Sequence, residues 1–267
     1  MKHLECVQTP WAARRPARRA RPAPLCAVLL ICGLSACATS PDPDSLDFDP
    51  FEEENRARHD ANLTVDRGLY RPVSMAYGET LPVPVRRSVT NLKRNWENPG
   101  YMVQYTLQGR PVLLGKSLTR FGVNTVLGLG GLFDVAGAMG VEYRDTNFDE
   151  TFYRWGVPEG GYVVLPFGGP GTQRDWTGWG LDILLDPVAW VAPASATWAL
   201  LGIATADLAN DRYELDPTID ELFYNSEDSY TAVRISYLQN LRAERRGGTG
   251  VEVLEDVYDV YDIYGDE

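Results

Sequence analysis

The chain of 267 residues carries a formal net charge of −12, and 44% of its residues are hydrophobic and 11% aromatic. This apolar content excludes wholesale disorder. The acidic charge argues against nucleic-acid binding, which needs Lys and Arg for the phosphates, and against electrostatic adhesion to anionic lipid headgroups.

Residues 1–36 have the organisation of a secretory signal peptide. A head with several arginines precedes an apolar run over 25–34, which is too short to span a bilayer. The segment ends in Leu34-Ser35-Ala36-Cys37, which resembles the lipobox of bacterial lipoproteins. That resemblance implies that residues 1–36 are removed and that Cys37 is acylated. An ordinary signal peptide with an unrelated cysteine is the alternative.

Cleavage before Cys37 would leave one cysteine, because Cys6, Cys26 and Cys32 precede it. A single cysteine excludes an intrachain disulfide, and acylation would remove a reactive thiol. Removing six basic residues and one acidic residue leaves 19 basic and 36 acidic ones, a net charge of −17. Residues 37–48 read as a lipidated tether. Ala38 replaces the Asp that commonly retains lipoproteins at the inner membrane, so the outer membrane is the expected location.

Residues 49–246 are expected to form one mainly α-helical domain. Asp49-Pro50 followed by three glutamates is typical of a helix start, and this helix is expected to run to about Arg67. Pro72 is expected to open a short second helix.

Two further helices are expected on either side of Pro99. Apolar residues recur at helical spacing over 84–97, and a residue before proline disfavours the helical conformation, so the first helix should stop there. The second is expected over 100–109. A short helix with an aromatic face is expected over 147–156, and a last helix over about 228–245.

The stretch 156–171 breaks the helical pattern with clusters of Gly and Pro. Its middle, Tyr162-Val163-Val164-Leu165, reads as a short strand, so a β-hairpin-like loop is expected. Thr172 and Asp175 then approximate a capping box that opens another helix.

Residues 188–206 carry no charge and are the one transmembrane candidate after cleavage. Pro193 and several Ser and Thr residues weaken that interpretation, so a buried or membrane-contacting helix is favoured.

Catalytic and metal-binding patterns are missing from the sequence. After loss of the signal peptide the one histidine is His59, and its charged neighbours indicate a solvated helix face. Asp216, Asp220 and Glu221 could be imagined as a carboxylate pair or a calcium site, but acids at a helix start are the favoured interpretation. We therefore expect no metal, no cofactor and no enzymatic activity.

The glycine-rich stretch over 119–140 is a poor nucleotide site. Gly128 and Gly130 fit the dinucleotide fingerprint, but Phe133 occupies the position of its third glycine, and no P-loop lysine follows. Glycines among apolar residues instead permit tight helix turns and close backbone approach.

Several stretches taken together resemble the MlaA (VacJ) family of outer-membrane lipoproteins. The matching residues, spread over roughly 49–245, are Asp49-Pro50, Glu52, Asn55-Arg56, Arg71-Pro72-Val73, Pro82, Pro84-Val85-Arg86, Leu107-Gln108-Gly109, Arg120-Phe121, Asn124-Thr125, Leu127-Gly128, Gly130 to Ala136, Trp155-Gly156-Val157, Tyr162, Leu165-Pro166 and Arg174-Asp175.

That resemblance implies a ring- or disc-like helical protein in the inner leaflet of the outer membrane. Such proteins are understood to take mislocalised phospholipids from the outer leaflet through an amphipathic channel. They work beside a trimeric porin and pass the lipid to a periplasmic carrier, which maintains lipid asymmetry. The alternative is a structural lipoprotein that scaffolds a porin or the envelope, and a lipid-cleaving hydrolase is a weaker third interpretation.

Two sets of residues are candidates for this task. Four apolar residues of the glycine-rich stretch are expected to contact acyl chains or the membrane: Phe121, Leu129, Leu132 and Phe133. Seven residues of the Gly/Pro loop are expected to gate the passage: Gly156, Gly160, Gly161, Tyr162, Leu165, Pro166 and Phe167. The alternatives are a packed helix junction for the first set and a static hairpin for the second.

Residues 247–267 are expected to form an acidic tail that is dispensable for folding. Seven acids and no bases lie in 252–267, after a glycine-rich break. Such a tail is typical of a solvated segment, which either solubilises the protein or touches a basic partner.

Overall fold

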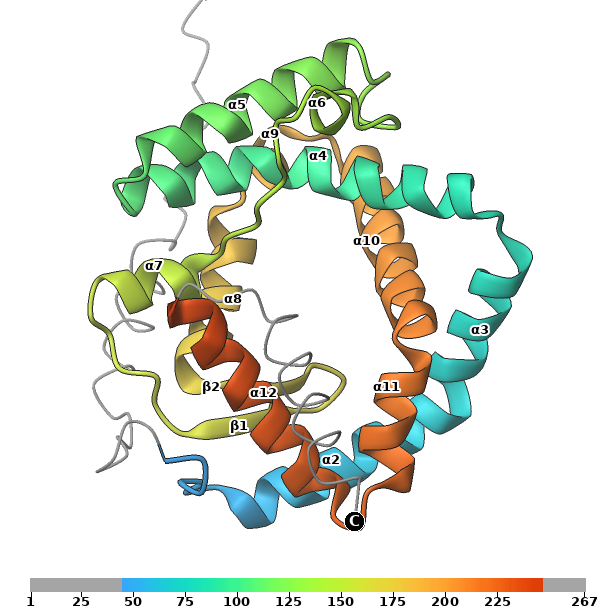
Figure 1. Cartoon of the computed structure of the whole chain (residues 1–267), viewed down its shortest axis with the longest axis vertical. Coiled ribbons are helices and arrows are strands. Elements are labelled where there is room, and N and C mark those ends of the chain that lie inside the picture. The colour runs from blue at the N-terminus through green and yellow to red at the C-terminus, as the bar shows by residue number, and fades with distance from the viewer. Residues whose placement is uncertain (1–44, 247–267) are drawn as a thin grey trace, which may run out of the picture. The chain divides into compact units, whose positions relative to one another are not determined.

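The computed structural model describes residues 45–246 of the chain, which form helices and one small hairpin (Figure 1). Cys37, the predicted signal peptide, most of the tether and the acidic tail lie outside the described residues. The elements in chain order are α2 (Glu52–Val65), π-helix η2 (Asp66–Tyr70), α3 (Arg71–Thr80), α4 (Val83–Leu107), α5 (Pro111–Val126), α6 (Val135–Ala138), α7 (Phe148–Arg154), β1 (Tyr162–Leu165), β2 (Gly169–Thr172), α8 (Gln173–Leu185), α9 (Pro187–Val191), α10 (Ala194–Glu214), α11 (Asp216–Asp220), π-helix η3 (Glu221–Asn225) and α12 (Ser229–Arg246).

These elements follow one another around a closed circuit of contacts. α2 leads through η2 into α3, which packs along α10, and α10 crosses α4. α4 contacts α7, α7 packs on α8, and α8 contacts the hairpin, whose first strand returns to α2. α5 lies along the other side of α4 (Figure 1). The prediction of a mainly helical domain with one hairpin is confirmed.

The expected break at Pro99 is wrong, because α4 runs through it from Val83 to Leu107. A proline inside a helix leaves the carbonyl four residues earlier without its backbone donor. Here the Asn98 side chain donates to the carbonyl of Asn95 at 3.3 Å and to that of Arg94 at 2.8 Å. Ser117 of α5 in turn donates to the side-chain oxygen of Asn98 at 2.8 Å. The Asn95 carbonyl, which lacks a backbone donor at Pro99, thus accepts a hydrogen bond from a side chain instead.

The expected solvated position of His59 is also wrong, since only 5% of the residue is exposed. Its ring packs edge-on against Tyr230 and Phe223, and Nε2 lies 3.0 Å from Ser229 Oγ. Burial lowers the pKa of His59 below its usual range. Asn55 and Asp66 are buried on the same helical stripe, so the first helix buries polar side chains at helical spacing.

The interior of the described residues is unusually polar. Buried polar and charged residues outnumber buried hydrophobic ones there. One small apolar cluster joins the hairpin to α12 through Tyr162, Val164, Tyr230 and Leu238. The helices are therefore held together largely by hydrogen bonds and ion pairs, and much apolar surface stays outside the interior.

The local signals around the hairpin are confirmed. β1 and β2 pair antiparallel, with Tyr162 opposite Thr172 and Leu165 opposite Gly169. The side chain of Thr172 accepts from the Asp175 backbone N–H, and Asp175 accepts from that of Thr172, which completes the capping box of α8. The predicted last helix and the short aromatic helix correspond to α12 and α7.

The uncharged stretch 188–206 is divided between α9 and α10 at Pro193. Trp190, Val191 and Trp198 are exposed, so of the two favoured alternatives burial is wrong for these side chains, and membrane contact stays a prediction. Among residues 45–246, no helix is both long enough and apolar enough to cross a membrane.

Candidate functional site

The glycine-rich turn joins α5 to α6 with three consecutive residues in the left-handed region. Leu129, Gly130 and Gly131 have φ values of 55°, 76° and 104°. A Cβ on Gly131 would lie 2.5 Å from the Cβ of Asn95 on α4, so glycine is required there for space and for conformation. Asn95 donates to Thr125 and to the Gly130 carbonyl at 3.0 and 3.2 Å, which seats the turn on α4.

Three polar side chains hold this turn closed. They are Arg120, Asn124 and Asp134, and we call them the polar latch. Arg120 donates to both carboxylate oxygens of Asp134, and Asn124 donates to one of them at 2.9 Å. The Asn124 side-chain oxygen accepts from the Ala136 backbone, and Asp134 accepts from that of Gly137. Burial favours the neutral acid, but the bonds from Arg120, Gly137 and Asn124 outweigh it and hold the pKa of Asp134 below its usual range.

The latch leaves the apolar side chains of the turn exposed. Leu129 and Phe133 are 66% and 56% exposed, and Leu132 is 37% exposed. Phe121 differs, because it lies half-buried on α5 with its ring edge-on to Trp96. The structure therefore brings three of the four candidate residues to the surface and leaves the fourth half-buried against Trp96 of α4.

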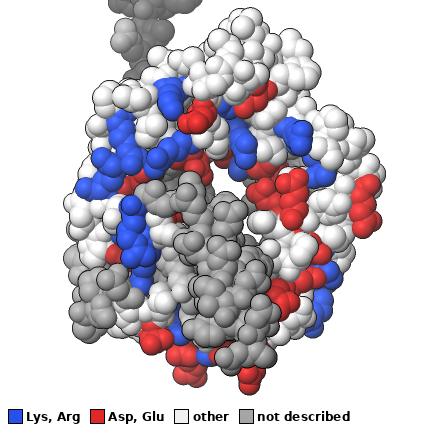
Figure 2. Space-filling model, in the orientation of Figure 1, with Lys and Arg blue, Asp and Glu red and all other residues white. Residues whose placement is uncertain are grey.

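Further exposed apolar side chains lie on other elements. They are Val112, Leu118, Val126 and Leu127 of α5 and its end, Met139 after α6, Trp179 and Ile183 of α8, Trp190 and Val191 of α9, and Trp198, Leu201 and Leu208 of α10. α5, α9 and α10 all contact α4. The outermost part of α5 and α6 is largely without charged side chains (Figure 2). We call these residues, with Leu129, Leu132 and Phe133, the apolar exterior.

The hairpin is anchored by side chains on both flanks. Asn55 of α2 donates to the Tyr162 carbonyl at 2.9 Å and accepts from the Val164 N–H at 2.8 Å. Asn62, two turns further along α2, donates to the Leu165 carbonyl and accepts from the Phe167 N–H. On the other flank, Trp176 of α8 donates to the Val163 carbonyl at 3.0 Å. These side chains thus satisfy backbone N–H and C=O groups of β1 that would otherwise pair with another strand.

The seven loop candidates occupy two environments. Tyr162 is buried in the apolar cluster, whereas Phe167 is 84% exposed at the tip with φ 62°. Pro166 is exposed beside it, and Leu165 is half-buried at the end of β1. The tip and the base of the loop therefore differ in burial.

The loop glycines are not equivalent. Gly156 and Gly160 have φ values of 80° and 78°. A Cβ on Gly160 would meet the Gln173 side chain at 2.7 Å, and one on Gly161 would meet Pro50 at 2.8 Å. Valine at either position would strain the fold itself, so neither substitution isolates loop movement.

The carboxylates considered for a calcium or hydrolytic site are ion-paired instead. Asp216 and Asp220 lie between Arg71 and Arg212, with nitrogen to oxygen distances of 2.5 to 3.1 Å. Arg212 also pairs with Asp66 at 3.0 Å, which ties α10 and α11 to η2. Over residues 45–246, no group of three or more His, Cys, Asp or Glu side chains is arranged to hold a metal ion.

Asn55, Asn62 and Arg120 are structural determinants that the sequence reasoning left without a role. Asn55, His59, Asn62 and Asp66 recur at helical spacing, and this periodicity is the signal that could have identified a polar face turned inward. Arg120 and Asn124 stand one turn apart on α5, so they reach the same carboxylate.

Comparison with known proteins finds a family model and relatives that match most of this chain. The family model described as MlaA lipoprotein matches residues 47–244. The chain is 37% identical over 221 residues to the Intermembrane phospholipid transport system lipoprotein MlaA of Shigella flexneri, covering 80% of this chain and 85% of that protein. The Haemophilus influenzae protein of the same name is 30% identical, over 87% of this chain and 94% of its own.

A solved structure agrees with these relatives. It is described as "Structural basis for maintenance of bacterial outer membrane lipid asymmetry", with a TM-score of 0.61 and 34% sequence identity. The match covers 72% of this chain and 96% of that one. With the family model covering most of the described residues, the chain belongs to the MlaA lipoprotein family.

Proposed function

We propose that this protein is a lipoprotein of intermembrane phospholipid transport that maintains outer-membrane lipid asymmetry. The observation that carries the proposal is the distribution of polarity. Apolar side chains of the turn, α5 and α8 to α10 are exposed, whereas Asn, Asp and Arg side chains are buried and bonded to one another.

An apolar exterior of this extent needs a nonaqueous neighbour. Soluble monomers rarely expose contiguous apolar patches above a few hundred Å², and larger ones mark protein or membrane contacts. Each Å² of apolar surface removed from water stabilises by about 25 cal/mol, so acyl chains against Leu129, Phe133 and Trp198 would stabilise the protein in the bilayer. The exposed tryptophans suit an interfacial depth, where one ring edge stays hydrated.

The finer features of the proposal concern the route and the partners. Phospholipid would leave the outer leaflet through an amphipathic channel, beside a trimeric porin, and pass to a periplasmic carrier. The hairpin would gate this route by movement of its tip at Pro166 and Phe167, while Asn55 and the buried Tyr162 hold its base.

Lipid attachment at Cys37 would hold the protein on the periplasmic face of the outer membrane. Stable anchoring takes more than one acyl chain, and each buried CH₂ contributes about 0.8 kcal/mol. Cys37→Ala is expected to leave an unprocessed precursor or an inner-membrane-retained protein. Mature-size Cys37→Ala protein in the outer membrane would contradict lipidation there.

Transport is proposed without cleavage of the lipid, in keeping with a family of transport lipoproteins. His59 and Ser229 lie within hydrogen-bond distance, but the adjacent Asp228 carboxylate is engaged by both outer nitrogens of Arg56 at 3.0 and 2.9 Å. An acid that oriented the imidazole would have to face His59 instead. Phospholipid turnover by the pure protein would overturn this part of the proposal.

The test expresses variants of the protein in cells whose own copy of its gene is deleted. Each variant replaces apolar side chains of the apolar exterior at the turn. Leu129→Asn with Phe133→Asn removes two exposed apolar side chains, and asparagine tolerates the positive φ of position 129 better than leucine does. We expect normal folding but loss of resistance to SDS with EDTA. Leu215→Asn, at another exposed leucine, is the control and should keep resistance.

Mass spectrometry of co-purified lipid separates transport from scaffolding. A transport protein is expected to carry phospholipid that the double variant loses. If the double variant keeps both the lipid and the barrier, the proposed contact surface is wrong. If the wild-type protein carries no phospholipid, the structural-lipoprotein alternative is favoured.

A further inference from the structure

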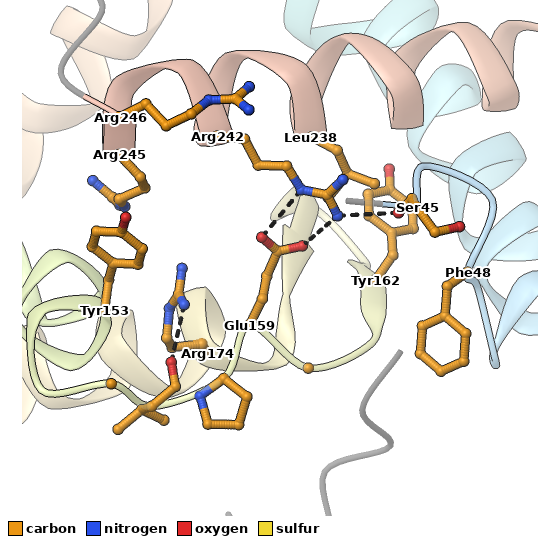
Figure 3. Close-up of a pocket in the computed structure, with 14 residues that line it drawn as sticks. Ser45, Phe48, Tyr153, Glu159, Tyr162, Arg174, Leu238, Arg242, Arg245 and Arg246 are labelled. Carbon is orange, nitrogen blue, oxygen red and sulfur yellow. Dashed lines mark hydrogen bonds and ion pairs between the residues drawn. The ribbon is translucent and has the colours of Figure 1, made fainter. Parts of the chain in front are cut away.

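A cavity of about 420 Å³ lies between the end of α12 and the loop that follows α7. Figure 3 shows Arg242, Arg245 and Arg246 on one side of it and Glu159 and Arg174 on the other. Its size falls within the range of sites for small ligands, roughly 300 to 1,000 Å³. Gly156, Gly160 and Tyr162 of the predicted gating loop line it, whereas the residues of the glycine-rich turn and of the hairpin tip do not.

The walls of this cavity carry more positive than negative charge. Four arginines line it, against the single acid Glu159. Glu159 pairs with Arg242 at 3.0 Å, and outside the lining Asp149 pairs with both Arg174 and Arg245. Arg246 is exposed at the rim, and residues 45–246 provide it with no ion pair at 4.0 Å or less. Among the lining residues one carboxylate thus faces four guanidinium groups, while Asp149, Glu150 and Asp175 act on Arg245 from outside the lining.

One donor at this site is buried without a partner. The Nε of Arg245 is shielded from solvent, and no hydrogen-bond acceptor for it lies among the described residues. The Arg245 side chain is only 13% exposed. A buried N–H that bonds to nothing is costly, so the Arg245 side chain sits here at a cost that its ion pair with Asp149 must offset.

Part of the wall is apolar. Phe48, Tyr153, Pro158 and Leu238 line the cavity together with the arginines (Figure 3). Such a wall suits carbon atoms bonded to a charged group better than it suits a bare hydrated ion.

We propose that this cavity binds a phosphate group, either the phosphodiester of a lipid headgroup or a free phosphate. Guanidinium forks match the geometry of phosphate oxygens, and the paired donors of several arginines would surround them. For a lipid headgroup the inference rests on the proposed function, because that function brings phospholipid to the protein.

The position of the cavity along the chain fits a lipid source. Ser45 lines it and stands eight residues after Cys37. Eight residues reach at most about 28 Å when fully extended. Acyl chains on Cys37 would therefore keep this cavity near the headgroup layer.

Calorimetry on the full mature protein in a sugar-based detergent tests the proposal. The probes are inorganic phosphate and dihexanoylphosphatidylglycerol below its micellar concentration. Arg242→Gln with Arg246→Gln is expected to weaken phosphate binding at least tenfold, because it removes two guanidinium groups that would donate charge-assisted hydrogen bonds to the phosphate. Arg87→Gln, at an exposed arginine of α4, is the matched control and should change affinity less than about twofold.

Glu159→Gln is expected to change the affinity for phosphate in the opposite direction. It removes the one lining carboxylate and releases Arg242 from that ion pair, so phosphate should bind at least about threefold more tightly. A merely structural role of this ion pair would weaken binding or leave it unchanged. Arg246→Gln alone keeps the test informative if the double variant misfolds, because Arg246 is exposed.

The outcomes separate the two sources. Equal affinity for both probes assigns a phosphate site, and tenfold preference for the short-chain lipid assigns a headgroup site. Binding to neither probe, or binding unaffected in the folded arginine variants, overturns the proposal. Binding only after removal of residues 247–267 also overturns it, since acidic side chains would then be the occupant. Because binding is measured on pure protein, failure of transport in cells is a separate result.

Discussion

Arg120 donates from one guanidinium nitrogen to both carboxylate oxygens of Asp134, at 2.8 Å each, across 14 residues of chain. The Arg120 side chain is only 4% exposed. This pair closes the loop that holds Leu129 and Phe133 outward, so the exposure of two apolar side chains depends on one ion pair whose arginine is buried.

Asp134→Ala is expected to destabilise the protein by about 3 kcal/mol, because it leaves the Arg120 guanidinium buried without its carboxylate. Asp134→Asn should cost less, since an amide oxygen can still accept from Arg120 and from the Gly137 N–H. Urea denaturation followed by far-UV circular dichroism measures both. Equal losses for the two variants would mean that the charge, and not the acceptor, holds the turn.

Gly130→Ala and Gly131→Ala form a second matched pair. Both residues have positive φ, which costs a non-glycine residue about 1 to 2 kcal/mol. A Cβ on Gly130 meets nothing within 4 Å, whereas one on Gly131 would overlap Asn95. Gly131→Ala should therefore lower the free energy of unfolding clearly more than Gly130→Ala. The reverse order in the same denaturation experiment would contradict this account of the turn.

Asn55→Ala should loosen the hairpin from α2. Asn55 is fully buried and serves the Tyr162 carbonyl and the Val164 N–H, so its loss leaves both groups unsatisfied, at about 1 to 3 kcal/mol each. Hydrogen exchange at Val164 should accelerate together with the loss of stability. Asn240→Ala, at an exposed asparagine of α12, is the control and should change stability by less than about 0.5 kcal/mol.

Asp182 gives the protein a pH-dependent stability. Burial raises the pKa of this carboxyl to about 7, although the Phe148 N–H and Gln104 donate to it. An acid whose pKa is raised on folding stabilises fully below its unfolded pKa of about 3.9, and this contribution is lost as pH rises through about 7.

Asp182→Asn should flatten that dependence, because an amide cannot ionise. We expect the melting temperature of the wild-type protein to fall relative to that of Asp182→Asn between pH 5 and pH 8. Parallel melting curves across this range would show that Asp182 does not titrate there.

The sequence by itself determined the features that neighbouring residues decide among themselves. The capping box of Thr172 and Asp175 and the apolar stripe of α12 each depend on residues a few positions apart. The Gly/Pro hairpin and the proline that opens α3 are equally local. Turn chemistry and helical periodicity act over such distances, so they can be read before the chain is folded.

Only the tertiary structure decided where the polar groups lie. Pro99 does not break α4, because Asn98 and a serine from α5 satisfy the groups around it. His59 is buried because aromatic rings more than 160 residues away cover it. Arg174 and Arg245, 71 residues apart in the chain, meet at the Asp149 carboxylate. The physical reason is that the cost of burying a charge or of leaving a carbonyl open depends on the partner that folding brings, and residue type alone does not name that partner.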